Sequence, residues 1–365
     1  MRSLRTWSLS VRVLVGLLAT AALLVGSRTV VSADEGRYQQ TNLVSDQAGV
    51  AATQDTDLVN AWGLVAGPTT PWWVSDNGTG LSTLYNAAGQ KQGLVVTVPP
   101  PAGGTTSAPT GVAFNGNPNE FAGSRFIFDT EDGTVSAFNG TPQAVLKVDN
   151  SGLGTVYKGL AIATSSSGDH LYATDFRHAR IDVFDSSFMP VMLPAGAFSD
   201  PMIPSGFAPF GIRNLDGKLF VTYAMQDAAM HDDVAGVGHG FIDVYSPDGM
   251  LIQRFARHGL LNSPWGMAVA PAGFGEFSGD LLVGNFGDGH IDAYSLPGGE
   301  LLGPLHGVDH QRLTIDGLWA LSFGNGATAN GPTTTLFFTA GPDDETHGLF
   351  GNLTPAPGDG PGNHR

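Results

Sequence analysis

A repeat with a period of about fifty residues constrains the fold of this chain more than any other sequence feature. Six segments share a pattern in which a variable residue is followed by glycine and an apolar pair. The variable residue and its glycine are, in order, Trp62-Gly63, Thr110-Gly111, Lys158-Gly159, Phe210-Gly211, Trp265-Gly266 and Asp316-Gly317. Successive glycines are 48, 48, 52, 55 and 51 residues apart. Such near-constant periods are typical of four-stranded units arranged around a common axis.

Each repeat contains further segments with the alternation of β-strands. Examples are WWVSD from Trp72, RIDVFD from Arg180 and MLIQRFA from Met250, and turn-forming Asp, Asn and Gly separate such segments. The last repeat lacks a fourth strand, while residues 38–44 precede the first repeat and are strand-like. We therefore predict an all-β, six-bladed β-propeller with four-stranded blades, its ring closed by this N-terminal strand on the last blade. The alternative, a β-sandwich, does not require six similarly spaced units.

The N-terminus carries the features of an export signal. Arg2, Arg5 and Arg12 precede or begin an apolar run over 13–25, and Val31-Ser32-Ala33 offers small residues at a cleavage site. The alternative, a membrane anchor, needs about 20 apolar residues. The predicted organisation is a signal peptide over 1–33, one propeller domain over 34–353 and a flexible tail over 354–365. An exported protein, extracellular or periplasmic, is expected.

Charge limits the classes of partner. The whole chain has a net charge of −16 and contains no cysteine. Removal of 1–33 takes away four arginines and no acidic residue, which leaves a net charge of −20. A field of this sign repels nucleic acid and anionic membranes, so the expected partners are small molecules, proteins or polysaccharides. No membrane span is expected after cleavage, and we expect a monomer.

Two sequence resemblances agree with this fold. Residues 175–184 resemble the NHL-type propeller repeat, with Asp175 followed by Ile-x-Val-Phe. The whole mature chain more closely resembles a family of secreted bacterial propellers that are known mainly as conserved hypothetical proteins. The matching stretches are NLVSDQAGVA, WWVSDNGTGLSTLYN, QDAAMHDDVAG, NSPWGMAVAPAGFGEFSGDLLVGNFGDG and LFFTAGPDDETHGLFG. This resemblance implies the fold and export, and it implies no established activity.

The residues before the repeat glycines form the first candidate site. In a propeller they lie near the central channel, on the face that also carries the loops between the second and third strands, which we call the entry face. In sixfold order, Lys158 would oppose Asp316. The predicted ligand-binding residues are Trp62, Thr110, Lys158, Phe210, Trp265 and Asp316. An aromatic mouth of this kind suits a sugar or a cation; in the alternative, the aromatic rings pack together and seal the channel.

The loop over 226–240 is the second candidate site. It concentrates imidazole and carboxylate groups that could bind a divalent metal or act in acid–base chemistry; these are Asp227, His231, Asp232, Asp233 and His239. Calcium-dependent lactonase propellers of the gluconolactonase type carry carboxylates and amides before the repeat glycine, where only Asp316 is similar here. This departure from the family pattern argues against a lactonase-type calcium site at the channel. A divalent metal such as Ca²⁺ bound elsewhere, as by this loop, is a candidate cofactor, and none is certain. The alternative is a solvated acidic loop, and the acidic turns at 129–133, 285–290 and 343–348 have a similar composition.

Three functional hypotheses remain open from the sequence. The first is a secreted propeller that binds a small neutral or cationic ligand, or a partner, at the entry face. The second is a metal-dependent, lactonase-like hydrolase that uses the His/Asp cluster of the fourth repeat. The third is a structural module of the cell envelope, which a filled channel would favour. No cysteine nucleophile and no Gly-x-Ser-x-Gly elbow is present.

Overall fold

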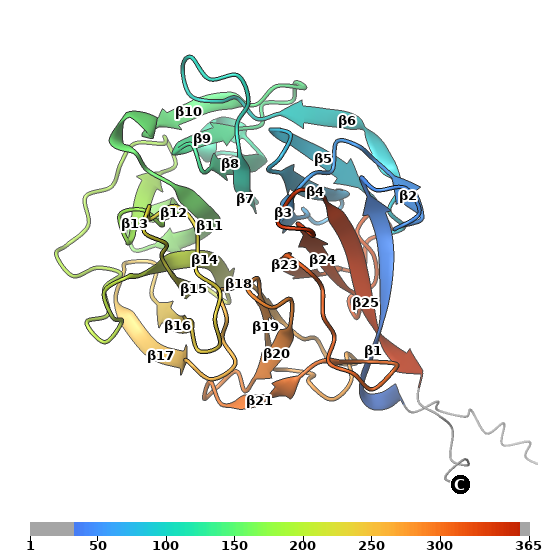
Figure 1. Cartoon of the computed structure of the whole chain (residues 1–365). Coiled ribbons are helices and arrows are strands. Elements are labelled where there is room, and N and C mark those ends of the chain that lie inside the picture. Colours follow the sequence, from blue (N-terminus) through green and yellow to red (C-terminus); the bar gives the residue numbers. More distant parts are fainter. Residues whose placement is uncertain (1–32, 358–365) are drawn as a thin grey trace, which may run out of the picture. The chain divides into compact units, whose positions relative to one another are not determined.

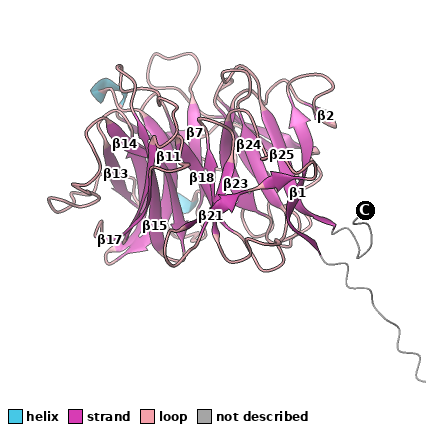
Figure 2. Cartoon of the chain, turned by 60° about the horizontal axis from the view of Figure 1, so that its bottom comes forward, coloured by secondary structure: helices cyan, strands magenta, loops and turns pink. Residues whose placement is uncertain are grey.

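Six β-sheets surround a central axis in the computed structural model, which describes residues 33–357, with side chains from residue 37 to 356. Figure 1 shows the sheets as blades of a ring, with one strand of each nearest the axis. Seen from another angle, strands and loops make up nearly all of the described chain (Figure 2). The only helices described are two 3₁₀ turns, Phe121–Gly123 and Ser151–Leu153. The predicted six-bladed β-propeller is confirmed.

The blades follow one another along the chain. Blade 1 consists of β3 (Ala61–Val65), β4 (Trp72–Asp76), β5 (Leu81–Tyr85) and β6 (Lys91–Thr97). Blade 2 consists of β7 (Pro109–Phe114), β8 (Phe126–Thr130), β9 (Thr134–Ala137) and β10 (Val145–Asp149). Blade 4 consists of β14 (Phe207–Leu215), β15 (Lys218–Met225), β16 (Gly240–Tyr245) and β17 (Leu251–Arg257). Blade 5 consists of β18 (Pro264–Val269), β19 (Leu281–Asn285), β20 (Ile291–Tyr294) and β21 (Leu301–Pro304).

Blade 3 is the exception to the four-stranded pattern. It consists of β11 (Tyr157–Ser165), β12 (Gly168–Asp175) and β13 (Arg180–Asp185). The predicted fourth strand, PVMLPAG from Pro190, is reduced to one bridge between Phe184 and Pro190 and one hydrogen bond from Val191 N to Val183 O at 2.8 Å. Proline has no N–H to donate to a ladder, so the two prolines of this segment limit its pairing.

The N-terminal strand closes the ring as predicted. In blade 6, β23 (Leu318–Phe323), β24 (Leu336–Ala340) and β25 (Leu349–Pro357) are followed by β1 (Ala33–Ser45), which pairs antiparallel with β25. The short strands β2 (Thr53–Gln54) and β22 (His306–Gly307) pair with β1 in parallel.

The predicted tail boundary is corrected by four residues. Strand β25 continues to Pro357 because its end still pairs with β1, with Pro355 opposite Tyr38. Residues 1–32 of the predicted signal peptide over 1–33 and residues 358–365 of the predicted tail lie outside the described residues. Across the part of the chain that is described, no helix has the length and apolar character needed to cross a membrane.

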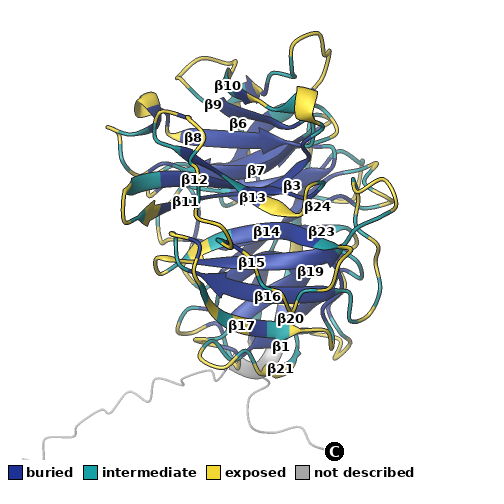
Figure 3. Cartoon of the chain, turned by 90° about the vertical axis from the view of Figure 1, so that its left-hand side faces the viewer, coloured by how far each residue is buried: buried dark blue, intermediate teal, exposed yellow. Residues whose placement is uncertain are grey.

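Hydrophobic clusters join neighbouring blades. One cluster combines Trp73 of blade 1 with Phe126 and Phe128 of blade 2, and another combines Tyr172 of blade 3 with Val221 of blade 4. Figure 3 shows buried strands and exposed connecting loops in each blade. Burial of apolar side chains between sheets stabilises the ring at roughly 25 cal/mol per Å².

The repeat glycine permits close approach between blades. A Cβ atom at Gly211 would lie 2.3 Å from the carbonyl oxygen of Trp265, the residue before the repeat glycine of the next blade. Each innermost strand has a register shift at this point, which in β14 falls between Pro209 and Ile212. The corresponding shift in β23 falls between Leu318 and Leu321, so Trp319 and Ala320 occupy the positions that the repeat assigned to Asp316 and Gly317. The alignment of the sixth repeat was therefore wrong by three residues.

Candidate functional site

Aromatic side chains fill the channel below the entry face. The ring of Trp319 stacks on Trp62 with centroids 3.5 Å apart and on Phe286 at 3.9 Å. Trp265 meets Trp319 edge-on at 5.9 Å, and Phe210 lies at the same distance from Trp319. Trp62, Phe210 and Trp319 are buried, whereas Trp265 is partly buried. These rings, which we call the aromatic layer, close the channel, as in the alternative in which they pack together and seal it.

Lys158 lies on the aromatic layer and is almost fully buried. Its Nζ is 5.1 Å from the centroid of the Trp62 ring and forms ion pairs with Glu131 and, at 3.1 Å, with Asp232. These two carboxylates raise the pKa of Lys158 against the opposing effect of burial. The predicted opposition of Lys158 and Asp316 is wrong, because Asp316 is exposed and its Oδ2 accepts a hydrogen bond from Asp343 N.

Thr110 has a structural role. It is fully buried, and its hydroxyl lies 3.0 Å from Oδ1 of Asp129. Burial raises the pKa of the Asp129 carboxyl to about 7. Thr110 therefore belongs to a buried contact between blades and is not available at a channel mouth.

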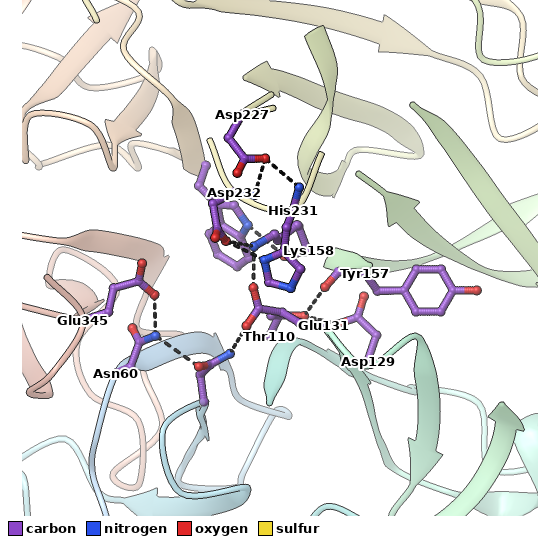
Figure 4. A network of polar contacts seen from close by, with 12 residues as sticks. Asn60, Thr110, Asp129, Glu131, Tyr157, Lys158, Asp227, His231, Asp232 and Glu345 are labelled. Atoms are coloured by element: carbon purple, nitrogen blue, oxygen red, sulfur yellow. Dashed lines mark hydrogen bonds and ion pairs between the residues drawn. The ribbon is translucent and has the colours of Figure 1, made fainter. Parts of the chain in front are cut away.

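A chain of polar side chains crosses four blades above the aromatic layer (Figure 4). Asn60 Nδ2 donates to Glu345 Oε2 at 2.6 Å and to Asn77 Oδ1 at 3.2 Å. Asn77 Nδ2 donates to Glu131 Oε2 at 2.9 Å, and Glu131 then pairs with Lys158. We call this set, together with Asp232 and His231, the polar layer.

The two layers are tied together by indole N–H groups. Trp319 Nε1 donates to Asn60 Oδ1, and Trp265 Nε1 donates to the Lys158 carbonyl, both at 2.9 Å. The buried Nε1 of Trp62 has no hydrogen-bond partner among the described residues. An unpaired buried donor is costly, and Trp62 Nε1 shares this state with Nε1 of Trp72 and Trp73.

The carboxyl groups of the polar layer differ in protonation. Burial, with the charge of Glu131 as the second cause, raises the pKa of Glu345 to about 7. The hydrogen bond from His231 lowers the pKa of Asp232, and the same bond raises the pKa of His231. Near neutral pH the layer therefore contains ionised Asp232 beside a carboxyl group that gains or loses its proton.

The residues predicted to bind a metal are only partly brought together. His231 Nδ1 lies 2.8 Å from Asp232 Oδ1, and these two residues form a group with Glu131 whose ligand atoms lie within 4.8 Å of one another. Asp227 instead accepts hydrogen bonds from the backbone of its own loop, and His239 Nδ1 bonds to the Val234 carbonyl. Asp233 is outside the group, and burial raises its pKa.

This donor set does not fit Ca²⁺. Calcium takes six to eight oxygen ligands, whereas the group offers one imidazole nitrogen and two carboxylates. A nitrogen–oxygen set of three suits a transition metal such as Zn²⁺ better. The single ammonium group of Lys158 forms ion pairs with both carboxylates and offsets one of their two charges.

Sequence reasoning missed the main members of the polar layer. Glu131 and Glu345 lie in acidic turns that match the turn composition expected of any hairpin, and Asn60 and Asn77 carried no motif. A usable signal was their position, because Glu131, Asp232 and Glu345 all lie in loops between the second and third strands of a blade.

Sequence relatives place the chain in a family. The uncharacterized protein R648 of Acanthamoeba polyphaga mimivirus is 34% identical over 330 residues, covering 85% of this chain and 78% of the viral protein. The uncharacterized protein L690 of the same virus is 34% identical over 329 residues, covering 85% and 84%. The chain belongs to the family of these viral proteins. These relatives are viral, whereas the sequence resemblance pointed to a bacterial family. No model of a known protein family matches the chain.

Solved structures agree with the family's fold. A Bacteroides thetaiotaomicron protein of unknown function has a TM-score of 0.55 at 12% identity, covering 87% of this chain and 76% of its own. The soluble aldose sugar dehydrogenase of Escherichia coli in its apo form has a TM-score of 0.53 at 12% identity, covering 87% and 99%. At this identity the likeness concerns the fold alone.

Proposed function

We propose that this protein binds a small cationic, hydroxylated ligand at the polar layer of the entry face. The observation that carries the proposal is the excess of acceptors there: Glu131, Asp232 and Glu345 surround a single ammonium group, that of Lys158. Asp232 and His231 are the exposed members of the layer and provide access from solvent. A ligand with one ammonium group and several hydroxyls, such as an amino sugar, matches this chemistry.

Each side chain has a defined task in this proposal. Lys158 pairs with both Glu131 and Asp232 and offsets one negative charge, so the exposed Asp232 and the ionised form of Glu345 carry the remaining negative charge for the ligand's cation. The Asn60 and Asn77 amides fix Glu345 and Glu131 at 2.6 and 2.9 Å.

Calorimetric titration with three sugars tests the proposal. Glucosamine is expected to bind, whereas glucose and N-acetylglucosamine, which lack the ammonium group, are expected to bind at least about tenfold more weakly. Glu345→Gln should weaken glucosamine binding. Asp344→Asn, a matched change at an exposed position of the same loop, should leave it unchanged. Equal binding of glucosamine and N-acetylglucosamine would contradict the proposal.

A metal-dependent, lactonase-like hydrolase is the second candidate, because Glu131, His231 and Asp232 lie close enough to share one ion. Zn²⁺ binding would require Lys158 to leave the two carboxylates. Its test is metal content and lactone hydrolysis of the purified protein loaded with Zn²⁺. One Zn²⁺ per chain, lost in His231→Ala and retained in His239→Ala, would support this candidate. A protein that retains no Zn²⁺ after dialysis would count against it.

Export and a monomeric state complete the proposal. They rest on the basic and apolar N-terminal segment and on the high negative charge. N-terminal sequencing of the secreted or periplasmic protein should begin at Asp34, and a form that retains residues 1–33 would contradict cleavage. Sedimentation at micromolar concentration should give one chain per particle.

A further inference from the structure

A second cavity lies at the other end of the central channel, beyond the aromatic layer. Its volume is about 270 Å³, and residues of the innermost strand of every blade line it. The walls include Val65, Phe114, Ile162 and Met267, and Trp265 contributes to both the cavity and the aromatic layer. Asn214 is exposed at its rim. The side chains that line the cavity are mostly apolar, polar atoms contribute slightly more of its surface than apolar atoms, and the cavity is separate from the polar layer.

Arg213 is the one charged residue among those that line this cavity. It comes from β14 of blade 4, three residues after Phe210, which places it about 10 Å further along the channel. The equivalent residues of the other blades are small: Val65, Ala113, Ala161, Ala268 and Ser322. Small side chains are thus sufficient to close the ring at this level, and the arginine needs another explanation.

The Arg213 guanidinium is not neutralised by any carboxylate in the described part of the chain. Among the described residues, its side-chain hydrogen bond runs from Nη2 to Ser322 Oγ at 3.1 Å, which joins blade 4 to blade 6. Burial lowers the pKa of Arg213, and no nearby charge offsets this effect. Three other arginines of the fold have acidic partners: Arg180 with Asp182, Arg254 with Asp200 and Arg312 with Asp292.

We propose that this cavity binds a monoanionic carboxylate with a short apolar body, and that Arg213 holds the carboxylate. A guanidinium stays charged in proteins, and its planar fork matches the two oxygens of a carboxylate. The apolar walls accept the body of the ligand. A ligand with a single negative charge fits this cavity, because one guanidinium faces it and the protein's net charge of −16 repels polyanions.

Titration of the full-length protein with hexanoate tests the proposal, read by calorimetry and by the fluorescence of Trp265. Hexanoate should bind, and hexanol and hexylamine should bind at least about tenfold more weakly. Arg213→Met should weaken hexanoate binding by a similar factor. Arg213→Lys keeps the charge but loses the fork, and an intermediate affinity is expected. Lys218→Met, which removes a positive charge at an exposed position, should bind hexanoate like the wild type.

Several outcomes would overturn the proposal. Equal affinity for hexanoate and hexanol would show an apolar cavity without an anion site. Inorganic phosphate binding as tightly as hexanoate would show a general anion site. If Arg213→Met does not fold, Ser322→Ala provides the second variant, since loss of the 3.1 Å contact should alter hexanoate affinity without removing the charge. These readouts are independent of glucosamine binding at the entry face.

Discussion

Trp62 and Trp319 stack with ring centroids 3.5 Å apart and planes inclined by 15°. They come from the innermost strands of blades 1 and 6, which are adjacent only because the ring is closed. Their contact therefore joins the first and last repeats at the channel, while β1 and β25 join them at the outer edge of blade 6. Trp319 also touches Trp265, Phe210 and Phe286, so it is the centre of the aromatic layer.

Replacement of Trp319 by alanine should destabilise the domain by about 3–5 kcal/mol, because a buried ring with aromatic contacts on several sides is removed. Urea unfolding measures this loss. Added indole should fill the new cavity and raise the melting temperature of Trp319→Ala but not that of the wild type. A loss below about 1 kcal/mol would show that the layer rearranges to fill the space.

Replacement of Gly211 by alanine should destabilise the domain by roughly 1–3 kcal/mol, because its Cβ would meet the Trp265 carbonyl oxygen at 2.3 Å. Gly93→Ala is the matched control, since a Cβ there meets nothing within 4 Å. Thermal unfolding of both variants provides the measurement. Equal stability of the two variants would mean that contact between blades does not explain the repeat glycine.

Replacement of Lys158 by methionine should destabilise the protein by about 3–5 kcal/mol at pH 8, because Glu131 would lose the partner of a buried ion pair. Chemical unfolding at this pH measures the loss. The control Lys218→Met, at an exposed position, should have a free energy of unfolding close to that of the wild type. A loss of the same size in this control would contradict the stabilising role assigned to the Lys158 ion pairs.

Glu345 should make stability depend on pH. Its pKa is about 7 in the folded protein against 4.5 for the ordinary group, so the folded state binds this proton more tightly. The free energy of unfolding should therefore fall as pH rises from about 4.5 to about 7, by roughly 2–3 kcal/mol from this group. Glu345→Gln should reduce this slope, while Asp129, with a pKa of about 7, still contributes. Asp344→Asn should keep the slope of the wild type.

Much of the fold could be predicted because its signals are local. The alternation within strands and the turn residues are visible in short windows, and comparing these windows along the chain gives the repeat period. Together they led to six blades and to closure by the strand around Tyr38. The reduced fourth strand of blade 3 was harder to predict, because PVMLPAG is apolar enough for a strand. In this segment the two prolines limit strand pairing despite the apolar pattern.

The candidate site was less predictable, as Lys158 and Asp316 illustrate. Their opposition followed from sixfold symmetry, yet Lys158 meets Glu131 and Asp232 because long side chains reach toward the nearest opposite charge. Loop conformation also decided which residues of the 226–240 segment face inward. Asp227 accepts a hydrogen bond from the backbone of its own loop, while His231 and Asp232 reach the polar layer.

By itself the sequence determined the number of blades and the chain's strongly negative charge, because both follow from composition and spacing. Only the tertiary structure decided that Trp319, and not Asp316, completes the ring of residues at the channel. The reason is that this position is defined by close contact with the neighbouring blade. The sixth repeat carries Ala320 where the other five carry glycine, so the local sequence pattern pointed to the wrong glycine, Gly317. Gly317 instead lies in a turn, where its carbonyl accepts a hydrogen bond from Gly341 N.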